Sequence, residues 1–149
     1  MTENPTPAIV YAGLIRRLMA IIYDLFLLLA LLFVTTAIIM IFNHGIAIEP
    51  GQPLYPFYVA CLVIISFCFY GWFWTHDGQT LGMKTWKMKL QQVNAQPVTW
   101  RLALIRYVTA VISWSPAGLG FIWSLFNTKK QTWHDIASHC IVVDLRTDK

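Results

Sequence analysis

The stretch at residues 18–42, LMAIIYDLFLLLALLFVTTAIIMIF, decides the fold of this chain. It contains a single charged side chain, Asp24. At a rise of about 1.5 Å per residue, a helix of this length exceeds the ~30 Å hydrocarbon core of a bilayer. It is too long for the apolar part of a signal peptide, and no small-residue cleavage site follows it. The sequence therefore predicts a first transmembrane helix over 18–42.

A second apolar stretch follows after a short loop at 43–53 that contains glycine and proline. Residues 54–74 read LYPFYVACLVIISFCFYGWFW and contain no charged side chain. Aromatic residues gather near both ends of the stretch, as they do where transmembrane helices meet the lipid headgroups. We predict a second transmembrane helix over 54–74.

The composition of the chain fits a membrane protein with a single domain over residues 1–149. Hydrophobic residues make up 57% and charged residues 12% of the chain, whereas soluble domains carry about 25% charged residues. The formal net charge is +4, but no Lys or Arg lies between Arg17 and Lys84. The basic residues thus bracket the apolar segments and form no continuous face for nucleic acid.

The positions of the basic residues predict the orientation in the membrane. An arginine pair, Arg16 and Arg17, precedes the apolar part of the first helix, whereas the loop at 43–53 has no basic residue. Further basic residues follow the second helix within 75–101. The positive-inside rule therefore places the amino terminus and the 75–101 segment in the cytoplasm. We also expect a basic rim that contacts anionic lipid headgroups, and its members are Lys84, Lys87, Lys89, Arg101, Lys129 and Lys130.

A third apolar segment at 102–126 allows two interpretations. A single crossing would place the two lysines that follow it outside the cell, against the positive-inside rule. The sequence SPAGLG at 115–120 interrupts the segment with a proline and two glycines, which favour a helix break. We therefore favour a hairpin of two short helices, 102–114 and 118–126, that returns to the cytoplasm before a tail at 127–149.

Two short segments predict a small β-ribbon on the cytoplasmic side. Trp86, Met88 and Leu90 alternate with polar residues, which is the pattern of a half-buried strand. Near the end of the chain, CIVVDL at 140–145 is rich in β-branched residues. The predicted fold class is an all-α polytopic membrane protein with two full transmembrane helices, a broken third apolar segment and this β-ribbon.

Asp24 is the strongest functional candidate, because a carboxylate within a membrane span is costly without a partner. It lies two helical turns beyond Arg17, on the same helix face and roughly 10 Å away. Arg106 lies at a comparable depth in the third segment and is a second candidate partner. The candidate site is either a buried ion pair that fixes helix packing or part of an ion pathway, and it comprises Arg16, Arg17, Asp24 and Arg106.

No other motif indicates catalysis or a bound cofactor. The stretch GQTLGMKT at 78–85 lacks the spacing of a phosphate-binding loop, because Met83 separates the second glycine from the lysine. His134 and His139 are too far out of helical phase to face one site, so we predict no metal site. No serine or cysteine has a convincing base and orienting group. We expect a protein that is not an enzyme and has no catalytic residue and no cofactor.

Four segments together resemble the RDD family of bacterial membrane proteins. They are GLIRRLMAIIYDLFLL at 13–28, DGQTLGMKTWKMKLQQV at 77–93, LIRYV at 104–108 and KKQTWHDIASHCIVV at 129–143. The resemblance covers nearly the whole chain, and the combination of segments is specific. The family is named after an arginine and two aspartates, which the resemblance assigns to Arg17 or Arg16, to Asp24 and to Asp135.

The resemblance implies a multi-pass protein of the bacterial inner (cytoplasmic) membrane without a defined activity. Three short apolar units are too few to enclose a pathway alone, and Ala117, Gly118 and Gly120 allow close helix contact. The first hypothesis is therefore assembly with itself or with other membrane proteins. The alternative is an oligomeric antiporter of sodium or another cation for protons that uses Asp24, because some relatives are associated with such exchange. A third hypothesis, lipid handling at the cytoplasmic face, rests on the basic rim.

Overall fold

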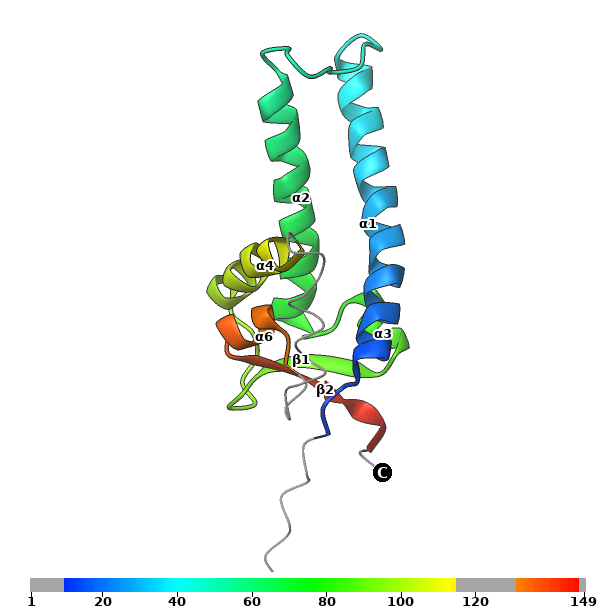
Figure 1. Cartoon of the computed structure of the whole chain (residues 1–149). Helices are drawn as coiled ribbons and strands as arrows, with labels where there is room; N and C mark the ends of the chain where they lie inside the picture. The colour runs from blue at the N-terminus through cyan, green and yellow to red at the C-terminus, as the bar shows by residue number, and fades with distance from the viewer. Residues whose placement is uncertain (1–9, 115–130, 148–149) are drawn as a thin grey trace, which may run out of the picture.

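The computed structural model of the chain describes residues 10–114 and 131–147. Two long helices, α1 (Leu14–Phe42) and α2 (Tyr55–His76), stand side by side, and the other elements gather around their lower ends (Figure 1). We call residues 25–69 the stem and the other described residues the head. The remaining elements are α3 (Leu81–Thr85), β1 (Met88–Gln92), α4 (Trp100–Trp114), α6 (Trp133–Ala137), β2 (Cys140–Asp144) and the 3₁₀ turn η2 (Leu145–Thr147).

The two long helices agree with the predicted transmembrane segments, 18–42 and 54–74. Each helix is long and apolar enough to cross a membrane. In the stem part of α1, no side chain is buried against the described remainder of the chain. The stem therefore leaves its apolar side chains exposed, which is the arrangement expected of helices that are covered by lipid or by other helices.

The first turns of α1 belong to the head. The helix begins at Leu14, earlier than predicted, and its buried side chains are Arg17, Ala20 and Asp24. These residues are spaced three or four positions apart, so they share one face of the helix. One face of the lowest part of α1 is thus covered by protein, whereas Ile15 in the same turns is 74% exposed. The arginine pair lies within the helix.

The predicted β-ribbon is present as an antiparallel sheet of β1 and β2, with Met88 opposite Asp144. Met88 and Leu90 are each 1% exposed, whereas Lys89 is on the open face. The alternation predicted for this strand is therefore confirmed for Met88 and Leu90 and wrong for Trp86. Trp86 lies before the strand, at the end of α3, and takes no part in the pairing.

Residues 10–12 pair with the other edge of β2, a contact that the sequence did not predict. Tyr11 forms an isolated antiparallel bridge with Val143, and the Ala12 N–H donates to the Val142 carbonyl oxygen at 3.0 Å. β2 is thus hydrogen-bonded on both edges, and its first four residues are buried. This position explains its unbroken apolar run, because a strand buried on both faces has no polar side.

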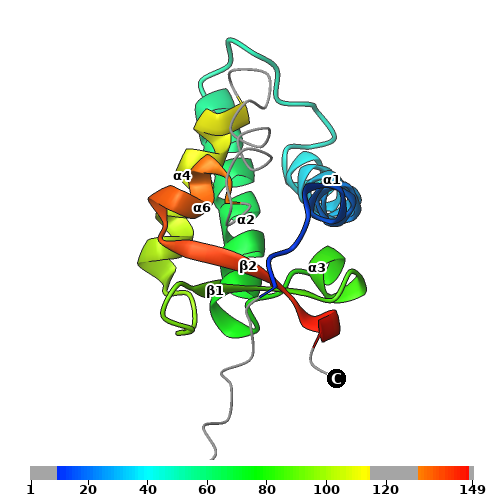
Figure 2. The same cartoon turned by 60° about the horizontal axis from the view of Figure 1, so that its bottom comes forward.

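The helix α4 corresponds to the first helix of the predicted hairpin, 102–114. It crosses the lower part of α2 obliquely and lies beside α6 (Figure 1). Gly71 of α2 allows this crossing, since a Cβ atom there would lie 2.7 Å from Cζ3 of Trp100. Figure 2 places α4 and α6 at one end of the sheet and α3 at the other. The predicted break and the second helix of the hairpin lie outside the described residues.

Candidate functional site

Asp24 is held by the GQTLGMKT segment that follows α2. Its Oδ2 atom accepts a hydrogen bond from the Thr80 hydroxyl at 2.5 Å, and its Oδ1 atom accepts one from the Gly82 N–H at 2.8 Å. Thr80 is also the N-cap of α3, where its hydroxyl accepts the Met83 N–H at 3.2 Å. Asp24 is only 3% exposed. The carboxylate therefore attaches the beginning of α3 to the side of α1.

Gly82 allows α3 to approach α1 closely. A Cβ atom at this position would lie 2.3 Å from the carbonyl oxygen of Ala20 and 3.0 Å from Oδ1 of Asp24. Ala20 is 2% exposed and lies on the same face of α1 as Asp24. Small residues on both helices thus leave the space in which the Gly82 N–H reaches the carboxylate.

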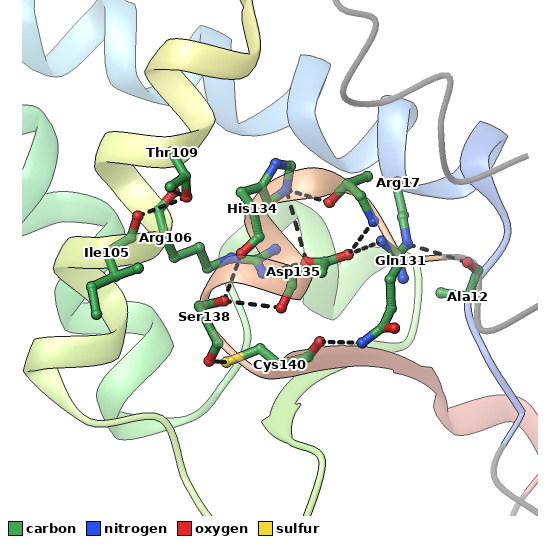
Figure 3. Close-up of polar contacts among 11 residues, drawn as sticks. Ala12, Arg17, Ile105, Arg106, Thr109, Gln131, His134, Asp135, Ser138 and Cys140 are labelled. Carbon is green, nitrogen blue, oxygen red and sulfur yellow. Dashed lines mark hydrogen bonds and ion pairs between the residues drawn. The ribbon is translucent and has the colours of Figure 1, made fainter. Parts of the chain in front are cut away.

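A second carboxylate, Asp135, joins α1, α4 and α6 (Figure 3). Its Oδ2 atom accepts a hydrogen bond from Nη1 of Arg17 at 2.5 Å, and its Oδ1 atom accepts one from Nη1 of Arg106. Asp135 is fully buried, and each arginine is 6% exposed. We call Arg17, Arg106 and Asp135 the Asp135 cluster, which brings together three segments that are far apart in the sequence.

The beginning of α6 fixes the position and the charge of Asp135. Thr132 is the N-cap of α6, and its N–H donates to Oδ2 of Asp135 at 3.1 Å. Burial by itself would raise the pKa of Asp135, but the charges of Arg106 and Arg17 outweigh it and hold the pKa well below its usual range. Asp135 is therefore an anion near neutral pH.

His134 is an uncharged neighbour of the Asp135 cluster. Its Nε2 atom lies 2.9 Å from the Thr132 hydroxyl oxygen. Burial, followed by the positive charge of Arg106, lowers the pKa of His134 to about 3. The imidazole thus adds no charge near neutral pH. Two guanidinium groups share one carboxylate, so the cluster has a surplus of one positive charge (2 − 1).

The structure does not form the predicted ion pair between Asp24 and an arginine. Within the described residues, both Arg17 and Arg106 pair with Asp135 instead. The Arg17 side chain turns away from Asp24, since its Nε atom donates to the Ala12 carbonyl oxygen at 3.2 Å and its Nη1 atom to Asp135. Arg106 extends over the ring of Trp74, with its Cζ atom 5.1 Å from the ring centroid, toward α6. The donors of α3 take the place that the sequence analysis gave to an arginine.

Arg16, the other member of the arginine pair, lies outside the Asp135 cluster. It pairs with Asp144 at the end of β2 and donates to the carbonyl oxygen of Trp86. Asp144 also accepts a hydrogen bond from Arg146 at 3.0 Å, and this contact is the main cause of its lowered pKa. Arg16 therefore ties the beginning of α1 to the end of the sheet.

The described residues of the predicted basic rim all lie in the head and are exposed. Lys84 pairs with Asp77 at 2.6 Å, and the side chains of Lys87, Lys89 and Arg101 are open to the surroundings. Lys129 and Lys130 lie outside the described residues. Within the described part of the chain, no three His, Cys, Asp or Glu residues lie together so that they could hold a metal ion.

The sequence of the chain matches a known protein family. The family model described as RDD family matches residues 11–139, which is most of the chain. The chain belongs to the RDD family. No curated protein and no solved structure gives a significant match to it. RDD membership and the two long apolar helices together indicate a membrane protein.

Of the residues that the resemblance assigned to the RDD motif, Arg17, Asp24 and Asp135 are buried in the head, whereas Arg16, the alternative arginine, is partly exposed. Arg17 contacts the second aspartate, Asp135, whereas the first aspartate, Asp24, is held separately by α3. Thr80 and Gly82 were not predicted as the partners of Asp24. Their signal was the short GQTLGMKT stretch, in which a helix-capping threonine and a glycine stand two positions apart.

Proposed function

We propose that this RDD protein is a non-enzymatic protein of the bacterial inner membrane that acts through assembly with itself or with other membrane proteins. The supporting observation is that the charged motif residues all lie in the head, whereas the helices of the stem are apolar. The charged residues of the motif are engaged in contacts within the head. The helical parts of the stem, 25–42 and 55–69, contain no Asp, Glu, Lys, Arg or His. Such a stem offers apolar helix surfaces and no chain of carboxylate, imidazole or basic side chains.

We further propose that the protein spans the membrane twice with its stem and that the head lies in the cytoplasm. The exposed basic residues support this orientation, because Lys87, Lys89 and Arg101 all belong to the head. The positive-inside rule then places the amino terminus inside and the loop at 43–53 outside. In this orientation the basic residues lie where anionic headgroups are available.

One face of α1 is the best candidate for contact with another helix. Phe26 is 71% exposed and Phe33 is 76% exposed, and their spacing of two turns puts them on the same face. Thr36 lies three positions beyond Phe33, on the side of α1 that adjoins α2, since its hydroxyl lies 3.0 Å from the Tyr58 hydroxyl. Helices in membranes associate by packing such surfaces closely.

Cysteine cross-linking tests self-assembly through this face. In a chain with Cys61→Ser and Cys68→Ser, we expect Phe33→Cys to form a disulfide-linked dimer in the membrane. Thr36→Cys is the matched control, because the same helix turns it toward α2 of its own chain. We expect about tenfold less dimer from this control. Equal, low yields from both variants, together with no co-purification of two differently tagged chains, would contradict self-assembly.

Replacement of Asp24 by asparagine separates the structural role from the antiporter alternative. A carboxylate accepts hydrogen bonds from both Thr80 and Gly82, whereas an amide has only one acceptor oxygen. We expect a destabilisation of roughly 1–3 kcal/mol, because one buried donor loses its acceptor. The measurement is unfolding in an uncharged detergent.

The same pair of proteins in inside-out vesicles provides the functional readout. A pH-sensitive dye reports whether added sodium or potassium collapses an imposed proton gradient. We expect no cation-dependent response from the parent or from Asp24→Asn at matched abundance. A response with the parent that disappears in a stably folded Asp24→Asn variant would instead support the antiporter and reject the purely structural role.

A further inference from the structure

A cavity of about 330 Å³ lies between the lower parts of α1, α2 and α4. This volume is in the range of pockets that bind small molecules. The two arginines of the Asp135 cluster line one part of its wall, and apolar residues line most of the remainder. The residues that matter for its chemistry are Arg17, Arg106, Ile21, Tyr107, Ala110 and Val111.

Both arginines have a buried donor that is not used. Among the described residues, neither Nη2 of Arg17 nor Nε of Arg106 has a hydrogen-bond partner. Each of these side chains is 6% exposed, so bulk water does not readily replace the missing acceptor. A buried N–H of a charged group without an acceptor is costly. Arg17 and Arg106 both line the same cavity, so an acceptor that enters it from outside the described chain meets the two guanidinium groups that carry these donors.

The charges at the arginine end of the cavity favour an anionic acceptor. Arg17 and Arg106 share the single charge of Asp135, and His134 is neutral because burial lowers its pKa to about 3. Asp24 also lines the cavity and adds a negative charge, but its oxygens accept hydrogen bonds from α3 and, among the described residues, pair with neither arginine. Guanidinium groups bind phosphate oxygens with charge-assisted hydrogen bonds. The arginine end of the cavity therefore suits a phosphate group.

The rest of the cavity suits an apolar body. Ile21 and Val111 lie on its wall, and Val111 is 59% exposed, so the wall continues onto the apolar surface of α4. Arg17 lies in the first turns of α1, below the apolar stem. With the head at the cytoplasmic membrane surface, as proposed above, this depth is that of the lipid headgroups.

We propose that the cavity binds an anionic phospholipid, with its phosphate on Arg17 and Arg106 and its chains directed past Ile21 and Val111 toward the stem. The proposal rests on the placement of the head at the membrane surface. It does not depend on self-assembly, because one chain supplies both arginines and the apolar wall.

Native mass spectrometry of the full chain in an uncharged detergent tests this site. The probes are phosphatidylglycerol, phosphatidylcholine and inorganic phosphate. We expect the parent to retain one phosphatidylglycerol molecule at least about tenfold more often than phosphatidylcholine, since only the former has a net negative headgroup. Inorganic phosphate is expected neither to be retained nor to displace the lipid, because it has no apolar body.

Two substitutions on α4 form a matched pair. Ala110→Trp places a large ring on the cavity wall and is expected to reduce retention of phosphatidylglycerol about tenfold. Val108→Trp adds the same ring at a position that is 48% exposed and is not part of the wall, so retention should equal that of the parent. Arg106→Lys keeps one charge but removes the guanidinium fork, and it is also expected to lose the lipid.

Three outcomes would overturn the proposal. They are equal retention of the two lipids by the parent, full retention of phosphatidylglycerol by Ala110→Trp, and displacement of the lipid by inorganic phosphate. The comparison of the two lipids on the parent needs no variant, so it decides the question even if a variant does not fold. A monomer that retains phosphatidylglycerol would support the lipid site and at the same time contradict self-assembly, which keeps the two proposals distinguishable.

Discussion

Replacement of Asp135 by asparagine is expected to destabilise the folded protein by about 3–5 kcal/mol, because it leaves two buried guanidinium groups without a counter-ion. Asparagine keeps the shape of the side chain but not its charge. Arg17 and Arg106 are each 6% exposed, so water cannot take over the role of the carboxylate. The variant also weakens the acceptor of the Thr132 N–H at the beginning of α6. Denaturant unfolding in an uncharged detergent, followed by tryptophan fluorescence, measures the difference.

The pKa of Asp135 determines the pH range in which the full destabilisation by Asp135→Asn can be measured. The folded-state pKa lies well below the unfolded value of about 3.9. A carboxyl group with a depressed folded pKa contributes its full stabilisation above the unfolded pKa and loses it as the pH falls toward the folded pKa. The comparison of parent and Asp135→Asn at pH 7 therefore reports the whole effect, and the effect should persist at pH 5.

Asp77→Asn is the matched control for charge removal. Asp77 also pairs with one basic residue, Lys84, at 2.6 Å, but this pair is exposed. We expect no measurable change in stability, because water solvates both partners after the substitution. Adding Arg106→Met to Asp135→Asn should recover part of the lost stability, since it removes one of the two uncompensated charges. Equal stabilities of Asp135→Asn and Asp77→Asn would show that the Asp135 cluster does not stabilise the fold.

The parts of the fold that could be predicted are those that local sequence patterns describe. The stretch at 18–42 and the stretch at 54–74 are long apolar runs, and both are helices in the structure. Met88 and Leu90 alternate with polar residues, and both face the core from β1. In each case the pattern repeats over several residues, so it identifies the element and the face that it buries.

The partners in the candidate site could not be predicted, because they depend on which distant segments meet. Asp24 contacts Thr80 across a separation of 56 residues, and Arg17 contacts Asp135 across 118. Residue spacing on a helix shows which side chains share a face, but it does not show what packs against that face. A small residue on that face, Ala20, was the available sign that a backbone approaches α1 closely.

Replacement of Gly82 by alanine is expected to destabilise the protein by about 3 kcal/mol, although alanine favours helices. Helix propensity alone predicts a gain of about 1 kcal/mol for this change in a helix interior. The new Cβ atom would lie 2.3 Å from the Ala20 carbonyl oxygen, however, and this atom belongs to the backbone of α1 and cannot rotate away. α3 must therefore move outward, which lengthens the hydrogen bond from the Gly82 N–H to Asp24. The cost of overpacking and of the lost hydrogen bond together exceeds the gain in stability from the higher helix propensity of alanine.

Unfolding in detergent measures whether Gly82→Ala lowers or raises the stability of the protein. A loss of stability is expected if α3 packs against α1 as closely as described. Gly13→Ala is the control, because nothing lies within 4 Å of a Cβ atom there, and its cost should stay below about 1 kcal/mol. A stabilised Gly82→Ala variant would contradict the close approach. The Gly82→Ala, Asp24→Asn double variant adds a second criterion. If both substitutions break the same contact, the double variant should be less destabilised than the sum of the single variants, because that contact can be lost only once.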